Sequence, residues 1–398
     1  MPSSPIRQIA DSASLAEAWR DLDSRATPAS RNTIGNDGLS INDIKADVKG
    51  NLVRIARDLR AGKYAFQSLR PYLIPKPNGK ERLICVPTVQ DRIVQRALLN
   101  YLQGLYGHRL DNGISYGFIK GKTVPDAARE ACRLRAKHPW LFKTDITSFF
   151  DRVDRDLMKA ALRRLVRQRS LHPILESVVD CEIFTHSNSK NRRIHQLGIH
   201  GGKGIRQGMP LSPFLSNVLL LGFDKWIESK GIPAIRYADD LVFFADSKND
   251  CQNLALACAS ELKRLQLDIP DIKNNSKSVI YEPTAHGEFL GLGLCQSGAG
   301  YDLRLLPKQL EKVLNSMRHF SSVKELVSRK IRFATLGQRL EAKRNGYLAA
   351  YELCSNFAEL KNRLNEVIDR ALRDLYSRDL GIDIGKLSPE ARAFLHLA

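Results

Sequence analysis

The sequence predicts an α+β fold: a mixed body that ends near residue 300, followed by an all-helical, basic domain. Three observations support this. Helical and strand-like periodicities alternate along the first 300 residues. Hydrophobic residues make up 43% of the 398 residues, enough to fill the cores of two or three domains. After Pro307 only helical spacing remains, as in the stripe Leu360, Leu364, Val367, Ile368, Ala371, Leu372 and Leu375.

The elements before residue 140 follow from spacing and turn chemistry. Residues 1–35 are rich in Ser, Ala and Arg, with a turn-forming stretch at Thr27–Arg31, and are assigned as an N-terminal extension. Lys76–Gly79 carries the Pro and Gly of a hairpin turn. The predicted elements are a helix at Ile41–Leu59, strands at Tyr72–Ile74 and Arg82–Val86, and helices at Asp91–Leu105 and Thr123–Arg135.

The second half of the body alternates in the same way. Residues 181–207 are polar, Gly-rich and basic, so we expect a hairpin or loop there. The other predicted elements are a strand at Leu141–Ile146, helices at Leu157–Val166 and Leu211–Ser229, two strands around a tight turn within Ala234–Phe244, a helix at Cys251–Leu265 and a strand at Phe289–Leu294.

The charge balance favours a polyanionic partner. Lys and Arg total 62 against 43 Asp and Glu, a formal net charge of +19. Each contact between a cation and a phosphate releases counterions, which favours nucleic-acid binding. Charge alone does not separate a nucleic-acid binder from a basic ribosome-associated or membrane-surface protein.

Targeting and cysteine signals point to a soluble cytoplasmic protein with no membrane contact. Met1–Ala10 lacks an apolar core, and the apolar run Val218–Gly222 is too short to span a bilayer. The seven cysteines form no C-x-x-C pair, so we expect reduced thiols and no zinc site. Gly198–Gly204 is one residue too short for a phosphate-binding P-loop.

The sharpest chemical feature is the pair Asp239–Asp240, flanked on both sides by strand-forming residues. A strand–Asp-Asp–strand places both carboxylates at a hairpin tip, where their repulsion requires cations, and hard oxygen ligands select Mg²⁺. Asp145 ends another short strand, Phe142–Ile146. If the two strands lie side by side, the acids could hold two metals about 3.5–4 Å apart. The alternative is an ordinary polar turn, since Asp is common in turns.

Tyr237-Ala238-Asp239-Asp240 resembles the YADD box of reverse transcriptases, and the family's other boxes stand around it in the family's order. The resemblance covers roughly residues 30 to 300, and ordered motifs are far more specific than any single one. In chain order the matching segments are Gly35–Gly38, Ile74–Arg82, Val86–Gln95, Ser115–Phe118, Asp145–Asp151, Arg206–Pro213, Tyr237–Asp240, Lys277–Ile280 and Phe289–Gly293.

This resemblance implies a right-hand polymerase that makes DNA on an RNA template with two Mg²⁺ ions, for which Mn²⁺ is a possible substitute. Its fingers, with part of the palm, would span residues 36–140 and its palm residues 141–300. An all-helical thumb would follow at residues 301–398. The metal ligands would be Asp145, Asp239 and Asp240, with the carbonyl of Ile146 as an additional ligand.

The resemblance also assigns the groups around the metals. Lys76 and Arg82 would close over the triphosphate, although a solvated charged hairpin is the alternative. Phe150 would face the sugar 2′ position and exclude ribonucleotides, unless it is only a core aromatic. Gln207 and Gly208 would begin a helix and contact the nascent base pair, where Gly allows close backbone approach.

Three further assignments concern the leaving group and the nucleic acid. Lys277 resembles the lysine that protonates pyrophosphate, with Lys273 as the nearby alternative. Phe289, Leu290 and Gly291 resemble the primer grip, which holds the primer end in line. In the basic C-terminal domain the cluster Arg329, Lys330 and Arg332 is expected to contact the nucleic-acid backbone; solvation of a helix face is the alternative.

Departures from the motifs narrow the lineage. Arg206-Gln207-Gly208 is unlike diversity-generating retroelement enzymes, and the missing NAxxH and late Val-Thr-Gly segments are unlike retron enzymes. Only enough chain for a thumb follows residue 303, whereas group II intron proteins usually add a DNA-binding region. The chain is therefore most similar to compact stand-alone bacterial enzymes of the group II intron-like lineage.

Several of those enzymes act in antiviral defence with a structured noncoding RNA. The expected partners are such an RNA as template, dNTPs and the cDNA product, and no feature predicts an oligomeric state. The alternatives are a truncated group II intron reverse transcriptase and maturase, a catalytically inactive RNA-binding maturase module, or an RNA-dependent RNA polymerase.

Overall fold

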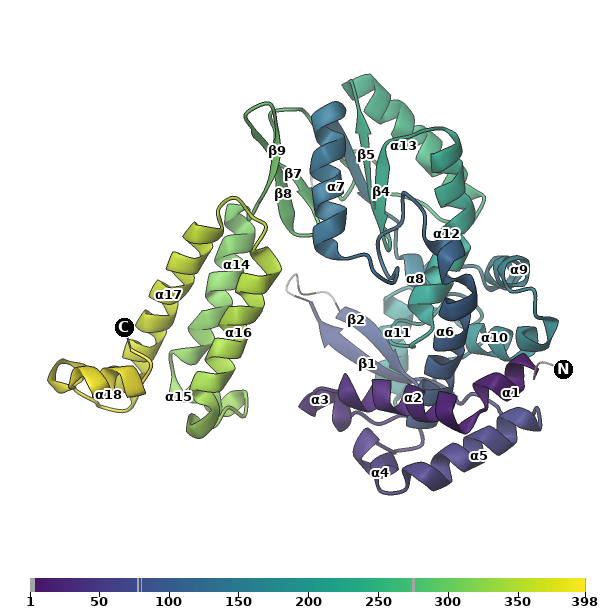
Figure 1. Cartoon of the computed structure of the whole chain (residues 1–398), viewed down its shortest axis with the longest axis horizontal. Helices are drawn as coiled ribbons and strands as arrows, with labels where there is room; N and C mark the ends of the chain where they lie inside the picture. Colours follow the sequence, from purple (N-terminus) through teal and green to yellow (C-terminus); the bar gives the residue numbers. More distant parts are fainter. Residues whose placement is uncertain (1–3, 77–78, 80, 274–275, 398) are drawn as a thin grey trace. The chain divides into compact units, whose positions relative to one another are not determined.

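The chain folds into two units in a computed structural model that describes residues 4–76, 79, 81–273 and 276–397 (Figure 1). The first unit contains residues 1–123 and 142–280, and the second contains residues 124–141 and 281–398. The chain thus leaves the first unit after residue 123, returns at residue 142 and leaves again after residue 280. The predicted boundaries of fingers, palm and thumb stay predictions, and each unit is described by itself below.

The N-terminal 35 residues are helical, whereas the sequence predicted only a turn-rich extension. Asp11 caps α2, whose buried Leu15, Ala18 and Trp19 pack toward α6. Helices this short depend on tertiary packing, so their apolar pattern is a weak signal in the sequence alone. The elements are α1 (Pro5–Ile9), α2 (Ser12–Ser24) and α3 (Pro28–Arg31).

The predicted helix over residues 41–59 is two helices, α4 (Ile41–Lys45) and α5 (Val48–Arg60). Asp47 lies between them with φ −141° and caps α5 by accepting a hydrogen bond from the Gly50 N–H. The predicted hairpin and long helix are confirmed as β1 (Arg70–Pro75), β2 (Glu81–Val86) and α6 (Val89–Leu110). The turn residues Pro77 and Asn78 lie outside the described residues.

A four-stranded sheet in the order β4-β5-β3-β6 carries the predicted catalytic acids. The stacked rings of Phe142 and Phe243, 5.7 Å apart, join the neighbouring strands β3 and β5. The predicted strands and helices of this region are confirmed as β3 (Trp140–Asp145), α9 (Arg155–Leu165), α12 (Ser212–Ser229), β4 (Ala234–Tyr237), β5 (Asp240–Ala245) and α13 (Lys248–Lys263). Further elements are α8 (Phe149–Arg152), α10 (His172–Val179) and β6 (Val279–Tyr281).

Residues 181–207 contain helix α11 (Asn188–Gln196), where the sequence predicted a hairpin or loop. Ser187 caps the helix, and Ile194 is its single buried residue. Arg193 bonds to Glu81 on β2, which anchors the helix to the hairpin. Because one apolar residue makes no periodicity, the sequence pattern did not reveal this helix.

In the second unit, α7 (Val124–Lys137) packs on a three-stranded antiparallel sheet, β7-β8-β9. The fully buried Arg135 of α7 donates to the carbonyls of Leu294 (2.6 Å), Glu282 (2.8 Å) and Ala285 (2.9 Å). The strands are β7 (Gly287–Phe289), β8 (Leu292–Ser297) and β9 (Gly300–Arg304). The predicted single strand at residues 289–294 is therefore a hairpin.

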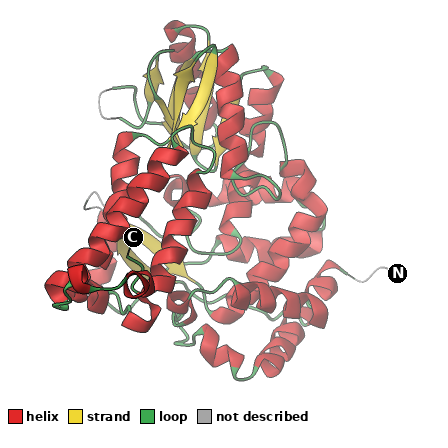
Figure 2. Cartoon of the chain, turned by 60° about the vertical axis from the view of Figure 1, so that its left-hand side comes forward, coloured by secondary structure: helices red, strands yellow, loops and turns green. Residues whose placement is uncertain are grey.

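The C-terminal part of the second unit is helical, as predicted, and the described chain as a whole is rich in helix (Figure 2). The predicted apolar stripe is buried at Leu360, Leu364, Ile368, Ala371, Leu372 and Leu375, and α17 packs on α14. The helices are α14 (Pro307–Met317), α15 (Val323–Ser328), α16 (Leu336–Tyr351), α17 (Phe357–Arg373) and α18 (Pro389–Phe394). No helix in the described ranges is long and apolar enough to cross a membrane.

Candidate active site

The acidic pair lies at the tip of the β4–β5 hairpin. Tyr237 pairs with Asp240, which leaves Ala238 and Asp239 as a two-residue turn. Ala238 has φ +58°, a conformation that usually requires Gly in such turns. Gly117 supports it from behind, since a Cβ at Gly117 would lie 2.3 Å from the Ala238 nitrogen. A strained turn that is held from outside is typical of functional sites.

A buried polar network lies behind this turn. The guanidinium of Arg236 donates to both carboxylate oxygens of Asp224, to Asn217 Oδ1 (3.0 Å) and to the Ala238 carbonyl (3.1 Å). Asn217 in turn donates its amide to the Gly117 carbonyl (3.0 Å). These bonds connect α12 to the β4 side of the turn and to Gly117 behind it, so they support the turn that carries Asp239.

Asp145, at the end of β3, meets the hairpin tip. The Ile146 N–H donates to the Asp239 carbonyl (3.0 Å), which joins the two segments directly. Burial raises the pKa of Asp239, and the nearby Asp145 raises it further. Burial also raises the pKa of Asp240, with Asp239 as the next cause. The neighbouring carboxylates thus add to the effect of burial, as expected for like charges held close together.

Lys277 forms an ion pair with Asp145 Oδ2. The adjacent Ser278 is fully buried, and its hydroxyl contacts the Thr144 hydroxyl at 2.7 Å, which fixes the lysine beside β3. The other carboxylate oxygen, Asp145 Oδ1, is buried and has no hydrogen-bond partner among the described residues. A buried carboxylate oxygen without a donor is suited to a cation.

These groups surround a cavity of about 670 Å³ within the first unit. Cations from the β1–β2 hairpin and carboxylates from the sheet line the same space. Of the residues predicted from the sequence, the cavity brings together Lys76, Arg82, Asp145, Ile146, Phe150, Gln207, Asp239 and Lys277. Asp240 and Gly208 do not line it.

The comparisons with known proteins agree with this arrangement. The sequence profile of the family "Reverse transcriptase (RNA-dependent DNA polymerase)" matches residues 74–294, more than half of the chain. The chain belongs to this family. The matched range contains both Asp145 and the Asp239–Asp240 turn, so the cavity lies within the reverse transcriptase domain.

Three curated relatives illustrate the similarity. Protein YkfC of Escherichia coli K12 is 30% identical over 56% of this chain and 57% of its own length. The retron Ec83 reverse transcriptase of Escherichia coli is 27% identical over 54% of this chain and 64% of its own length. The group II intron-encoded protein LtrA of Lactococcus lactis is 24% identical over 50% of this chain and 33% of its own length. The match thus spans less than two thirds of each relative and includes retron and intron proteins.

Within this reverse transcriptase domain, Gln207 and Gly208 form a turn, and α12 begins only at Ser212. The prediction that they begin a helix is wrong. Gly208 has φ +110°, and a Cβ there would lie 2.5 Å from the Cys85 carbonyl oxygen. The Cys85 N–H donates to the Gln207 carbonyl (2.7 Å). The close approach that requires Gly is therefore to strand β2.

Phe150 is partly exposed and lies edge-on to the buried Phe149, with ring centroids 5.2 Å apart. The Ile205 N–H donates to the Phe150 carbonyl (2.8 Å). A Cβ at Gly204 would lie 2.8 Å from that same oxygen, so the loop before Gln207 packs tightly on the Phe150 backbone. This support leaves the Phe150 ring on the cavity wall, where it could contact a substrate.

Several lining residues were not predicted. Asp151 lies in the Asp145–Asp151 motif without an assigned role, and burial raises its pKa while Arg206 and Lys76 oppose this. The others come from the β1–β2 hairpin, from the start of α8 and the segment before it, and from the end of α11 and the residues after it. They are Gly79, Glu81, Leu83, Ser148, Phe149, Gln196, Leu197 and Ile199. Those of the hairpin and of the α8 region lie within or next to recognised motifs, whereas those around α11 belong to no recognised motif.

The residues fit a divalent metal that is only partly ligated by protein. Among the described residues, no group of three or more His, Cys, Asp or Glu could hold a metal ion. Mg²⁺ often takes one or two carboxylates and completes its shell with substrate phosphates and water. The unpartnered Asp145 Oδ1, beside the raised-pKa carboxyl of Asp239, fits that pattern.

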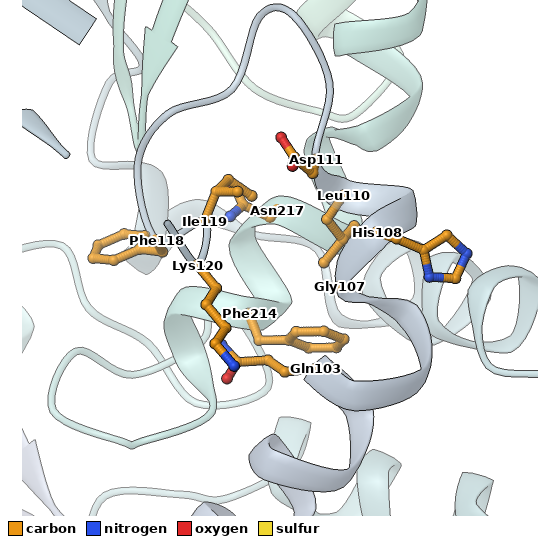
Figure 3. A pocket seen from close by; sticks show the side chains of 10 residues that line it. All are labelled: Gln103, Gly107, His108, Leu110, Asp111, Phe118, Ile119, Lys120, Phe214 and Asn217. Carbon is orange, nitrogen blue, oxygen red and sulfur yellow. The ribbon is translucent and has the colours of Figure 1, made fainter. Parts of the chain in front are cut away.

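A smaller cavity of about 170 Å³ lies between α6 and α12, and its polar groups do not converge (Figure 3). Phe118 and His108 point away from its centre in opposite directions, while Phe214 lies between Gln103 and Leu110. It contains one carboxylate, Asp111, which pairs with Lys122 at 2.8 Å. Nothing there could position two cations.

The remaining predicted residues belong to the second unit. Leu290 and Gly291 form the β7–β8 turn with φ +51° and +78°, and Phe289 before them is buried. Arg329, Lys330 and Arg332 are exposed between α15 and α16, in a loop rather than on a helix face. Arg329 pairs with Glu325 (3.3 Å).

Proposed function

We propose that this protein is an RNA-directed DNA polymerase that makes cDNA from a partner noncoding RNA in bacterial antiviral defence. The observation that carries the polymerase activity is the convergence of Asp145 and Asp239 with Lys277, Arg82 and Lys76 on one cavity. An acidic pair opposite cations is the arrangement that nucleotidyl transfer from a triphosphate requires.

Asp145, Asp239 and Asp240, with the Ile146 carbonyl, would hold two divalent ions, Mg²⁺ or Mn²⁺, which supply charge neutralisation and a more acidic primer hydroxyl when bound. Lys76 and Arg82 bind the triphosphate through charge-assisted hydrogen bonds. Phe150 restricts the space at the sugar 2′ position. Lys277 leaves its ion pair with Asp145, pairs with the leaving pyrophosphate and donates a proton to that pyrophosphate.

The defence role rests on the likeness to compact group II intron-like enzymes and on the similarity to a retron reverse transcriptase. A second candidate is an RNA-binding maturase, which the similarity to intron-encoded LtrA favours. The intact acidic triad favours the polymerase, because a maturase that only binds RNA has no use for three crowded carboxylates that repel one another.

Primer extension on an RNA template with purified protein tests the activity. Asp145→Ala and Asp239→Ala should each reduce the rate by about a thousandfold or more, with RNA affinity nearly unchanged. The exposed Asp271, which pairs with Lys273, provides the control variant Asp271→Ala. No extension by the wild type, or full activity in either active-site variant, would disprove the polymerase assignment.

A further inference from the structure

A second large cavity of the first unit, about 640 Å³, shares no lining residue with the active-site cavity. It lies between the C-terminal ends of α6, α9 and α13 and the middle of α12. In Figure 1, α9 lies to the right of α12, whereas the β1–β2 hairpin that borders the active site lies to its left. Its floor is apolar and includes Leu219, Leu221, Phe223 and Leu265.

Four exposed cations surround this floor: Arg109, Arg164, Arg167 and Lys225. In the part of the chain that the structure describes, none of the four forms an ion pair with a carboxylate. Neighbouring cations do. Arg163 makes two bonds to Glu176 (2.7 and 2.9 Å), and Arg264 bonds to Glu261 (2.9 Å), the one carboxylate that lines the cavity.

Tyr106 contacts one of these cations through its ring and the backbone of another. The Arg109 guanidinium lies over the Tyr106 ring, 5.8 Å from its centroid. The Tyr106 hydroxyl accepts a hydrogen bond from the backbone N–H of Arg167 (3.2 Å), which fixes the chain that carries this arginine. Helix dipoles explain a cation in the last turn of α6 or α9, but Lys225 is not in the last turn of α12. Helix dipoles therefore do not account for all four cations around this cavity.

The geometry points to a binding site for single-stranded RNA outside the active site, with phosphates on the four cations and one unstacked base on the apolar floor. Three of the cations are arginines, whose planar forks fit phosphate oxygens. An acidic helical peptide is the less suitable occupant, because it needs a groove that receives apolar side chains over several turns. This inference concerns binding and does not depend on polymerase activity.

The test is fluorescence titration of a labelled single-stranded RNA of about ten nucleotides, in EDTA without dNTPs, at several salt concentrations. Arg164→Gln/Arg167→Gln/Lys225→Gln should weaken binding about tenfold and flatten the salt slope by about 2. The control Arg57→Gln/Lys159→Gln/Arg163→Gln removes the same charge from cations paired with Asp58, Asp180 and Glu176, and should change binding little.

A steric variant separates the cavity from its charge. Gly222 lines the cavity, and a Cβ there has no neighbour within 4 Å. Gly222→Trp should fill the floor and weaken RNA binding severalfold with the salt slope unchanged. Melting temperatures confirm that each variant is folded, and primer extension at saturating template should stay at the wild-type rate for all of them.

Two results would overturn the inference. One is wild-type RNA affinity in both the glutamine triple variant and Gly222→Trp. This result would show that the cavity does not bind RNA and either binds a protein or has no ligand. The other is equal weakening by the control triple variant, which would show that only net charge matters. Loss of polymerase activity in every protein, wild type included, would instead count against the proposed function.

Discussion

Arg236 and Asp224 form an ion pair that is closed to solvent, with side chains 0% and 1% exposed. Two bonds join them, from Nε to Oδ1 (2.7 Å) and from Nη2 to Oδ2 (2.5 Å). The remaining guanidinium nitrogen donates to the carbonyl of Ala238, the residue before the acidic pair Asp239–Asp240. The geometry of the acidic turn therefore depends on a charge pair that substrate does not contact.

Asp224→Asn should lower the free energy of unfolding by about 3–5 kcal/mol, because it leaves the Arg236 charge buried without a counter-charge. Urea denaturation measures this loss. The control Asp180→Asn removes the exposed partner of a surface pair with Lys159 and should change stability by less than about 1 kcal/mol. Equal effects of the two substitutions would show that burial of the pair is unimportant.

Lys277→Met should tighten Mn²⁺ binding in the absence of nucleotide, on the order of tenfold, because Lys277 competes for Asp145. Primer extension should nevertheless slow by about a hundredfold if Lys277 protonates the leaving group. Electron paramagnetic resonance of free Mn²⁺ and single-turnover kinetics measure the two effects. Lys273→Met, at the exposed alternative lysine, should change neither; a slower reaction there would move the assignment to Lys273.

Asp240→Asn should raise the melting temperature in EDTA by a few degrees at neutral pH. Burial, with Asp239 as the next cause, raises the pKa of Asp240, so the folded state binds its proton more tightly than the unfolded state. Protonated Asp240 therefore contributes to folding stability. This contribution is fully present below the pKa of the unfolded state and is lost as the pH rises through the pKa of the folded state. The advantage of the variant should therefore disappear in thermal melts below about pH 4. A constant difference at every pH would refute this origin.

Phe150→Val should increase incorporation of ribonucleotides relative to deoxyribonucleotides by about tenfold or more, because it opens the wall that would face the sugar. Competition assays on one template give the ratio. Phe184→Val, at an aromatic that is 48% exposed and does not line the active-site cavity, is the matched control. An unchanged ratio in Phe150→Val would exclude Phe150 from sugar selection.

Alanine at Arg329, Lys330 and Arg332 should weaken binding to many RNA sequences, flatten the salt dependence and shorten the products. Arg363, Arg373 and Arg378, each paired with a carboxylate, provide a control triple variant with the same charge change. Salt-dependent titration and product-length analysis measure the effect. Unchanged salt slope and product length would show that the cluster does not contact the nucleic acid.

The sequence by itself determined the elements whose signals are local or strongly periodic. The acidic hairpin is an example, because a two-residue turn and its flanking strands lie within twelve residues of chain. Helices α6 and α12 are others, since their length makes the apolar pattern clear. The ordered motifs predicted the family, and the matched profile confirms it.

Only the tertiary structure decided the features that depend on distant parts of the chain. Helix α11 has one buried residue and bonds to Glu81 on β2, so no pattern in its own sequence marks it. The N-terminal helices are too short to be stable without packing. In the sequence, nothing distinguishes Arg236 from the other cations of a basic chain. Its burial against Asp224 and the pairing of Lys277 with Asp145 form only when distant segments fold together. The tertiary structure decides which charges matter most, because an ion pair is stronger in the protein interior than at a surface where water screens it.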